Sequence, residues 1–156
     1  MRRQQKGFSL IELLIVVAII LIIAAIAIPN LLRSKMVANE ASAVGSLRTI
    51  NTACIEYSTT YGGYPAALTN LGPATPATST SADLIDSVLA TGTKSGYTFA
   101  YAAGASDANG NVLAYTITAN PTNRGTTGQR GFFTNQTGVI RADATTAATA
   151  TSTPIS

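Results

Sequence analysis

The sequence predicts an α+β fold in which a long N-terminal helix packs on a small, mostly antiparallel β-sheet of three or four strands. Three observations support this prediction. An apolar run opens the chain, a one-sided helical pattern follows it directly, and alternating segments separated by turn residues occupy the second half. A chain of 156 residues has room for one domain and one separate segment.

The apolar run is long enough to cross a membrane. Residues 13–28 are sixteen apolar residues in succession. Counted from Phe8, the run before Pro29 has 21 residues and is interrupted only by Ser9 and Glu12. As a helix it spans about 31 Å, and the hydrocarbon core of a bilayer is about 30 Å thick. We therefore predict a transmembrane helix over this run.

The helix is expected to continue beyond the run with a single apolar face. Apolar residues recur there at steps of three and four: Val44, Leu47, Ile50, Cys54, Tyr57 and Tyr61. Pro29 is expected to kink the helix, and Gly62-Gly63 to end it. We predict one helix from about Phe8 to Tyr61. Its first half needs lipid or other helices around it, and its second half needs a globular domain.

Turn residues and alternating segments predict the remaining elements. Residues 83–90 are predicted to form a short helix capped near Ser81. The predicted strands are 97–103, 112–119, 130–134 and 139–142. Turns are predicted at 106–111 and 135–138. The tail from Asp143 is rich in Ala, Thr and Ser, and we predict that it is frayed and flexible.

The net charge of +3 originates at the start of the chain. Without Arg2, Arg3 and Lys6, seven basic side chains face seven acidic ones. This leading cluster favours a cytoplasmic N-terminus, with the rest of the chain on the other side of the membrane. Because no basic patch with interleaved aromatics remains, we predict no specific nucleic-acid partner. A narrower contact through Arg124 and Arg130 stays open.

The residue inventory excludes several kinds of site. The chain has one cysteine, Cys54, and no histidine, which excludes an intrachain disulfide, a metal site built on His and Cys, and a His-dependent triad. The carboxylates are scattered, so we predict no catalytic residues, no metal site, no cofactor and no enzyme activity. Residues 107–111 resemble the start of a calcium loop, but the loop glycine and the distal glutamate are missing, which favours a hairpin turn. Cys54 lies on the apolar helix face and is expected to be a buried small hydrophobe.

Glu12 is the unexpected residue of the apolar run. A charge inside a membrane span costs about 2.5–3.5 kcal/mol, so this carboxylate requires a partner. An ordinary single-span anchor explains the run but not Glu12. A secretory signal cleaved near Ala25-Ile26-Ala27 does not explain it either, nor the amphipathic helix that follows.

The stretch KGFSLIELLIVVAIILIIAAIAIP resembles the type III signal of type IV pilins and type II secretion pseudopilins, and SLRTINTACIEYSTTYGGYP is also similar to pilins. The resemblance implies that a prepilin peptidase cuts after Gly7 and methylates the new N-terminal Phe8. Glu12 and Pro29 match the family's glutamate and its kinking proline. The resemblance divides the chain into a leader (1–7), a transmembrane or filament-core helix (8–29), an amphipathic continuation (30–61) and a globular domain (62–156). Many pilins close a C-terminal loop with a disulfide, which this sequence cannot form.

A filament subunit is the function that the resemblance implies. The amine on Phe8 of one subunit would neutralise Glu12 of a neighbour. The implied partners are copies of the chain, the prepilin peptidase, an inner-membrane platform protein and a cytoplasmic assembly ATPase. The implied location is the inner membrane before assembly and the cell surface afterwards. Adhesion, motility and DNA uptake are all roles of such filaments.

Several alternatives remain open on sequence grounds. The nearest is a type II secretion pseudopilin, and another is a minor tip subunit that adheres or captures DNA. Tyr57, Tyr61 and Tyr64 suggest a conductive aromatic stripe, although aromatics at helical spacing usually belong to a core. Residues 135–137 have the form of a glycosylation acceptor but also of a turn.

Overall fold

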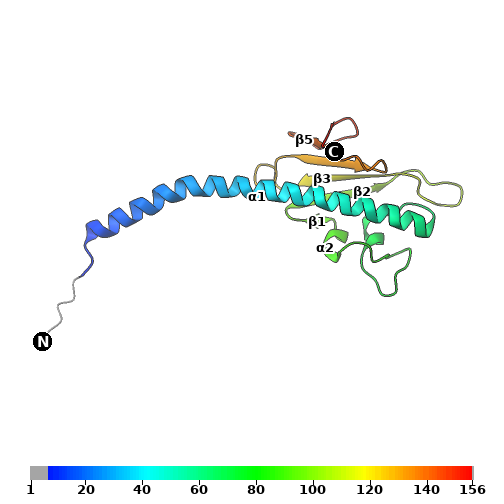
Figure 1. The fold of residues 1–156 in the computed structure, drawn as a ribbon, viewed down its shortest axis with the longest axis horizontal. Helices are drawn as coiled ribbons and strands as arrows, with labels where there is room; N and C mark the ends of the chain where they lie inside the picture. The colour runs from blue at the N-terminus through cyan, green and yellow to red at the C-terminus, as the bar shows by residue number, and fades with distance from the viewer. Residues whose placement is uncertain (1–6, 156) are drawn as a thin grey trace. The chain divides into compact units, whose positions relative to one another are not determined.

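The computed structural model describes residues 7–155. Its fold divides into two units, Met1–Lys35 and Met36–Ser156. Helix α1, Leu10–Tyr61, spans the boundary between them (Figure 1). It begins two residues later than the sequence predicts, because Phe8 and Ser9 precede its first turn. The predicted leader charges Arg2, Arg3 and Lys6 lie outside the described residues.

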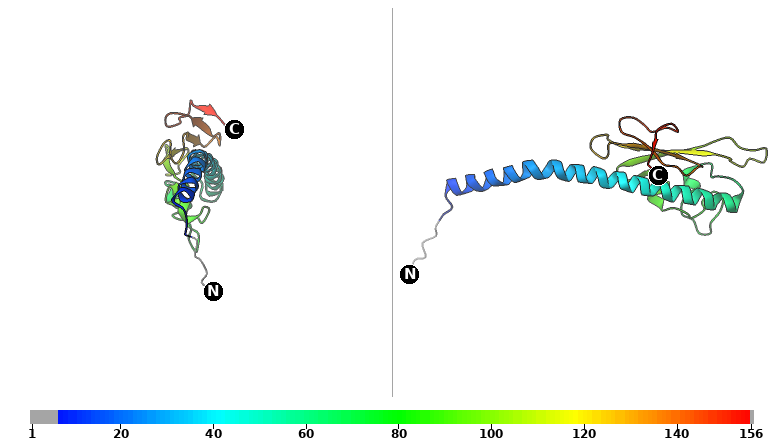
Figure 2. Two further views of the ribbon diagram at one scale, coloured as in Figure 1. Left: turned by 90° about the vertical axis from the view of Figure 1, so that its left-hand side faces the viewer. Right: turned by 45° about the horizontal axis from the view of Figure 1, so that its top comes forward.

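The second unit contains an antiparallel sheet whose strands follow one another in sequence order. Within the described residues the sheet has six strands, more than the three or four predicted. They are β1 (Thr93–Lys94), β2 (Tyr97–Ala103), β3 (Tyr115–Pro121), β4 (Gly131–Asn135), β5 (Arg141–Asp143) and β6 (Thr153–Pro154). In register, Phe99 of β2 faces Ala119 of β3, and Ala119 faces Phe132 of β4. Figure 2 shows the part of α1 that belongs to this unit, residues 36–61, lying along one side of the sheet.

The predicted apolar face of the helix is confirmed. Leu47, Ile50, Cys54 and Tyr57 are buried, and Val44 and Tyr61 pack at the edge of the same cluster. The sheet contributes large side chains that are almost completely buried, among them Tyr97, Tyr115, Ile117 and Phe132. Burying one such side chain stabilises a fold by about 1.5–3 kcal/mol. The second half of α1 is therefore part of the domain core.

The segment between α1 and the sheet differs from the prediction. The predicted helix 83–90 is shortened to α2 (Ser87–Ala90), which follows a single 3₁₀ turn, η1 (Leu68–Leu71). A helix cannot start at Asp83, because its φ of 56° lies in the left-handed region. Asp86 is the N-cap instead, and its carboxylate accepts the N–H of Leu89 at 2.9 Å. Ser81, the predicted cap, donates to the carbonyl of Gly72.

The two predicted turns are confirmed and are built by side chains. Asp107 accepts the backbone N–H groups of Asn109 and Asn111 at 2.8 and 2.9 Å, which closes the connection between β2 and β3. Asn135 accepts the backbone N–H and the hydroxyl of Thr137 in the same way after β4. Both are Asx turns, in which a short polar side chain replaces a backbone acceptor.

The tail after Asp143 makes specific contacts that its composition does not indicate. The guanidinium of Arg141 donates to the carbonyl of Ser152 at 2.9 Å, and the N–H of Ile155 donates to the carbonyl of Ile140 at 2.9 Å. Ala148 is buried, and β6 extends the sheet. Backbone N–H groups of the following turn hold the Asp143 carboxylate and lower its pKa to about 2. The flexibility of the tail stays a prediction.

A buried polar contact fixes α1 on the sheet. Asn51 donates to the hydroxyl of Thr134 at 3.0 Å and accepts the hydroxyl of Tyr115 at 3.0 Å. All three residues are buried. One side-chain amide of the helix therefore bonds to both β3 and β4, and its two hydroxyl partners are too buried to bond to water in its place.

We expect Asn51→Ala to lower the free energy of unfolding of the full chain in detergent by about 2–3 kcal/mol, since it leaves two buried hydroxyls without their partner. Urea unfolding followed by tyrosine fluorescence measures this. Thr52→Ala is the matched control, because Thr52 is exposed on the same helix and should change stability by less than about 0.5 kcal/mol. Equal effects of the two substitutions would contradict the assigned role of Asn51.

Candidate processing and assembly site

The predicted cleavage bond lies in non-helical chain. Gly7 and Phe8 precede α1, and the Phe8 side chain is 87% exposed. A Cβ added at Gly7 would meet no atom within 4 Å, so the space around the bond is open. Proteases cut accessible, non-helical backbone more readily than a hydrogen-bonded helix. Among the described residues, nothing crowds the Gly7–Phe8 bond.

Glu12 caps the first turn of α1. One carboxylate oxygen, Oε2, accepts the backbone N–H of Ser9 at 2.8 Å, and the carbonyl of Ser9 accepts the N–H of Leu13. This is half of a capping box, in which a glutamate at the third helical position reaches back to the residue before the helix. Within residues 7–155 the other oxygen, Oε1, has no hydrogen-bond partner. Sequence reasoning missed Ser9, although the Ser-x-x-Glu spacing indicates the box.

The helix beyond Glu12 is apolar and exposed. From residue 7 to residue 35 every residue is exposed except Ala24, which is half-buried. Seventeen large apolar side chains between Phe8 and Leu32 are exposed. By length and composition, α1 is the one helix of the described chain that qualifies as a membrane span. At about 1.5–3 kcal/mol each, these side chains favour lipid or protein over water by tens of kcal/mol.

Pro29 lies inside the helix, about 26 Å beyond Glu12 along the helix axis at 1.5 Å per residue. The helical assignment continues through it. Because proline has no N–H, the carbonyl of Ala25 loses its usual helical donor. The structure thus gathers Gly7, Phe8 and Glu12 around the first turn, whereas Pro29 lies five turns further on.

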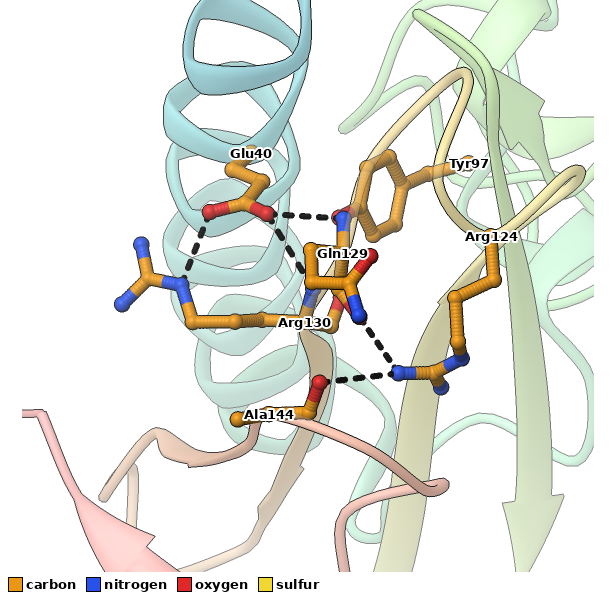
Figure 3. Close-up of polar contacts among 6 residues, drawn as sticks. All are labelled: Glu40, Tyr97, Arg124, Gln129, Arg130 and Ala144. Atoms are coloured by element: carbon orange, nitrogen blue, oxygen red, sulfur yellow. Dashed lines mark hydrogen bonds and ion pairs between the residues drawn. The ribbon is translucent and has the colours of Figure 1, made fainter. Parts of the chain in front are cut away.

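Figure 3 shows that Arg124 and Arg130, the two arginines left open as a nucleic-acid contact, are engaged within the domain. Arg130 pairs through Nε with Glu40 of α1 at 2.8 Å, and its guanidinium lies 5.4 Å from the centre of the Phe132 ring. Arg124 donates to the carbonyls of Gln129, Ala144 and Thr146. Both side chains therefore hold loops of the domain together.

Glu40 is a buried carboxylate with three donors. Its Oε1 accepts the backbone N–H groups of Gln129 and Arg130 at 2.9 and 3.1 Å, and its Oε2 accepts Nε of Arg130. Burial disfavours the charged form, but the hydrogen bonds from Gln129 and Arg130 outweigh it, and the pKa of Glu40 lies below its usual value. The sequence places Glu40 among scattered carboxylates and gives no sign of this contact, because its partners are about 90 residues away in the chain.

The remaining candidates of the sequence belong to the core. Cys54 is buried, as predicted, and burial raises the pKa of its thiol to about 12, which makes it a poor nucleophile. The tyrosine rings pair as Tyr57 with Tyr61 and Tyr64 with Tyr115, with centroids 4.7 and 4.8 Å apart. These pairs lie within or beside the hydrophobic cluster.

An exposed apolar helix with a capped glutamate four residues after a Gly–Phe bond, joined to an α+β domain, defines a prepilin-like protein. A family model described as the prokaryotic N-terminal methylation motif matches residues 2–28. Along this N-terminal region the chain is similar to type IV pilins and to type II secretion pseudopilins.

Curated relatives match along the N-terminal region. The type IV wide pilus major component PilA4 of Thermus thermophilus is 63% identical over 38 residues, which are 24% of this chain and 29% of the relative. The type IV major fimbrial protein FimA of Dichelobacter nodosus is 50% identical over 58 residues, 35% of this chain and 37% of FimA. The type II secretion system core protein G of Dickeya chrysanthemi is 31% identical over 81 residues, 49% of this chain and 53% of the relative. The chain thus spans between about a quarter and about half of these relatives.

The buried Glu40 carboxylate predicts a pH effect on stability. Because its pKa is lower in the folded state, Glu40 stabilises the fold fully above its ordinary pKa of about 4.3, and this contribution is lost as pH falls through the lowered folded value. We expect Glu40→Gln to cost about 1.5–3 kcal/mol at pH 7, with the difference from wild type shrinking as pH falls below about 4. Urea unfolding of wild type and variant at several pH values measures this difference in unfolding free energy. The other carboxylates are the same in both proteins, so their contributions cancel.

The exposed Glu56→Gln is the matched control and should leave the stability profile unchanged. A stability loss for Glu40→Gln that stays constant down to acidic pH would show that shape, not charge, matters at residue 40.

Proposed function

We propose that this chain is the precursor of a structural subunit of a type IV pilus, cleaved after Gly7, N-methylated at Phe8 and polymerised through its apolar helix. One observation carries the proposal. Within about one helical turn, the N-methylation motif contains an accessible Gly–Phe bond and a carboxylate with one oxygen unpartnered in the described chain. The role is structural rather than catalytic.

Cleavage supplies the partner that Glu12 needs. It creates a free amine on Phe8, the residue next to the N–H that Glu12 already accepts. Unpaired charges inside a bundle of apolar helices are strongly destabilising, whereas a paired and hydrogen-bonded carboxylate is tolerated. The amine of a neighbouring copy neutralises Glu12. Since apolar helices alone slide past one another with little preference, this ion pair sets their register.

The apolar helix supplies the driving force. Before assembly its exposed Leu, Ile and Val side chains lie in the inner membrane, with the N-terminus in the cytoplasm. In the filament, copies of the same segment replace lipid around it. The prepilin peptidase, an inner-membrane platform and a cytoplasmic ATPase act on the subunit. The finished filament lies on the cell surface, where it serves adhesion, motility or DNA uptake.

A type II secretion pseudopilin is the second candidate. The match to core protein G extends over 49% of this chain, further than the 35% matched by FimA, although at lower identity. Both candidates need the same processing of Gly7 and Phe8. They differ in abundance outside the cell, because a major pilin dominates sheared filaments, whereas a pseudopilin stays in the envelope and a minor tip subunit is scarce.

Mass spectrometry of the N-terminal peptide from sheared, purified filaments tests the proposal directly. We expect the dominant protein to begin at a methylated Phe8. The same peptide found only in the envelope fraction would assign the chain to a pseudopilus. An intact Met1, or a terminus near Ile28, would overturn both candidates, because Glu12 would then have no amine partner.

Substitution of Glu12 separates its two contacts. Glu12→Gln keeps an acceptor for the Ser9 N–H but removes the charge, and Glu12→Val removes both. We expect both variants to lose filaments by about tenfold or more, since the pair of Glu12 with the Phe8 amine needs the charge. Electron microscopy counts the filaments, and mass spectrometry follows methylation. Wild-type filament numbers for Glu12→Gln would show that capping alone explains this residue.

A further inference from the structure

A hollow lies where α1 ends. It has a volume of about 160 Å³ and is formed by three stretches of chain that are distant in the sequence, residues 57–66, Ser79 and residues 110–112. The end of α1, the turn after it, the loop around Ser79 and the connection between β2 and β3 meet there. Figure 1 shows the end of α1 and that connection at the same end of the globular unit. The residues that the argument uses are Tyr57, Tyr61, Tyr64, Ser79, Asn111 and Val112.

The walls of the hollow are held in place by hydrogen bonds. The N–H of Tyr64 donates to the carbonyl of Val112 at 2.8 Å, and the hydroxyl of Tyr57 donates to the carbonyl of Ser79 at 2.6 Å. Gly63 approaches Asn111 so closely that an added Cβ would lie 2.9 Å from the Asn111 Cβ. The shape therefore exists before any ligand enters, and little ordering is needed on binding.

The lining combines aromatic rings with polar groups that are free to bind a ligand or water. Tyr61 and Tyr64 are half-buried, and within residues 7–155 their hydroxyls have no hydrogen-bond partner. The side-chain oxygen of Asn111 is likewise without a partner there, since only its Nδ2 is used, by Asp107. Such a tyrosine offers an apolar face and a polar tip to the same ligand.

We propose that this hollow binds a neutral pyranose ring. A sugar ring has an apolar face of C–H groups that packs on aromatic rings, and a rim of hydroxyls that pairs with tyrosine and amide groups. No charged side chain is among the lining residues, which disfavours ionic ligands. The volume is below the range of about 300–1,000 Å³ typical of drug-sized ligands and suits a single ring.

The proposed site does not rest on filament formation. All of its residues belong to the unit Met36–Ser156, whereas processing and assembly are proposed for residues near Gly7 and Glu12. A chain that fails to be cleaved or to assemble can still bind the sugar, and an assembled filament can lack binding. The two proposals therefore fail separately.

Saturation-transfer difference NMR on the full chain tests the proposal, in a zwitterionic detergent without a sugar headgroup. The probes are the methyl glycosides of galactose, glucose and N-acetylglucosamine, with benzyl alcohol as an apolar comparison. We expect at least one glycoside to bind with a Kd of about 1–10 mM, as suits a single-ring ligand. Transfer to none of the glycosides at about 50 mM, or to benzyl alcohol alone, would overturn the proposal.

Variants locate the binding. We expect Tyr61→Ala to raise the Kd about tenfold or more, and Tyr61→Phe, which keeps the ring, to raise it less. Leu113→Ala is the matched control, because Leu113 is exposed near the same connection but does not line the hollow. It should bind like the wild type. If Tyr61→Ala keeps its thermal midpoint and its affinity, or if Leu113→Ala loses as much affinity, the sugar binds elsewhere and the assignment is wrong.

Discussion

The position of α1 on the sheet depends on two buried polar contacts. Glu40 and Asn51 are eleven residues apart, about three helical turns, so both lie on the face that packs against the domain. Glu40 holds the chain just before β4, and Asn51 holds β3 and β4 themselves. Apolar packing is non-directional and tolerates small rotations and shifts of a helix. The hydrogen bonds of Glu40 and Asn51 do not tolerate such movements. They therefore fix which residues of α1 are buried.

One continuous helix serves two different surroundings because its composition changes along its length. Before residue 36 the described side chains are almost all exposed and mostly apolar, whereas between Glu40 and Tyr57 one face of the helix is buried and the opposite face is exposed. The first segment gains free energy only where lipid or other helices cover it. The second segment gains free energy by packing on the globular domain of its own chain. On the proposed function, protein can thus replace lipid around the first segment while the globular unit stays folded.

Hydrophobic periodicity predicted those elements whose buried residues recur regularly over a long stretch of sequence. The face of Leu47, Ile50 and Cys54 follows from the 3.6-residue period, and β2 has the predicted bounds because its residues alternate clearly. The strands β1 and β6 have two residues each, so no period can reveal them, and pairing with their neighbours creates them. The start of α2 depends on one backbone angle, at Asp83.

The candidate site shows the same division between local and long-range signals. Gly7, Phe8 and Glu12 belong to one short motif, so the sequence alone predicts them, and the turn at Asp107 was likewise predicted. The cap at Ser9 was readable from its spacing but was missed. The partners of Glu40 and the hollow beside Tyr61 depend on segments that meet only in the folded chain, and no local pattern indicates them.

The way in which the C-terminal segment is held has a consequence for how the domain matures. Guanidinium groups of Arg124 and Arg141 bind backbone carbonyls of that segment, and the single cysteine of the sequence is buried in the core. No thiol has to be oxidised, and no wrong sulfur pairing has to be corrected, before the native contacts form. The native contacts of the domain therefore do not depend on whether the surroundings are oxidising or reducing, and no disulfide-forming enzyme is needed to make them.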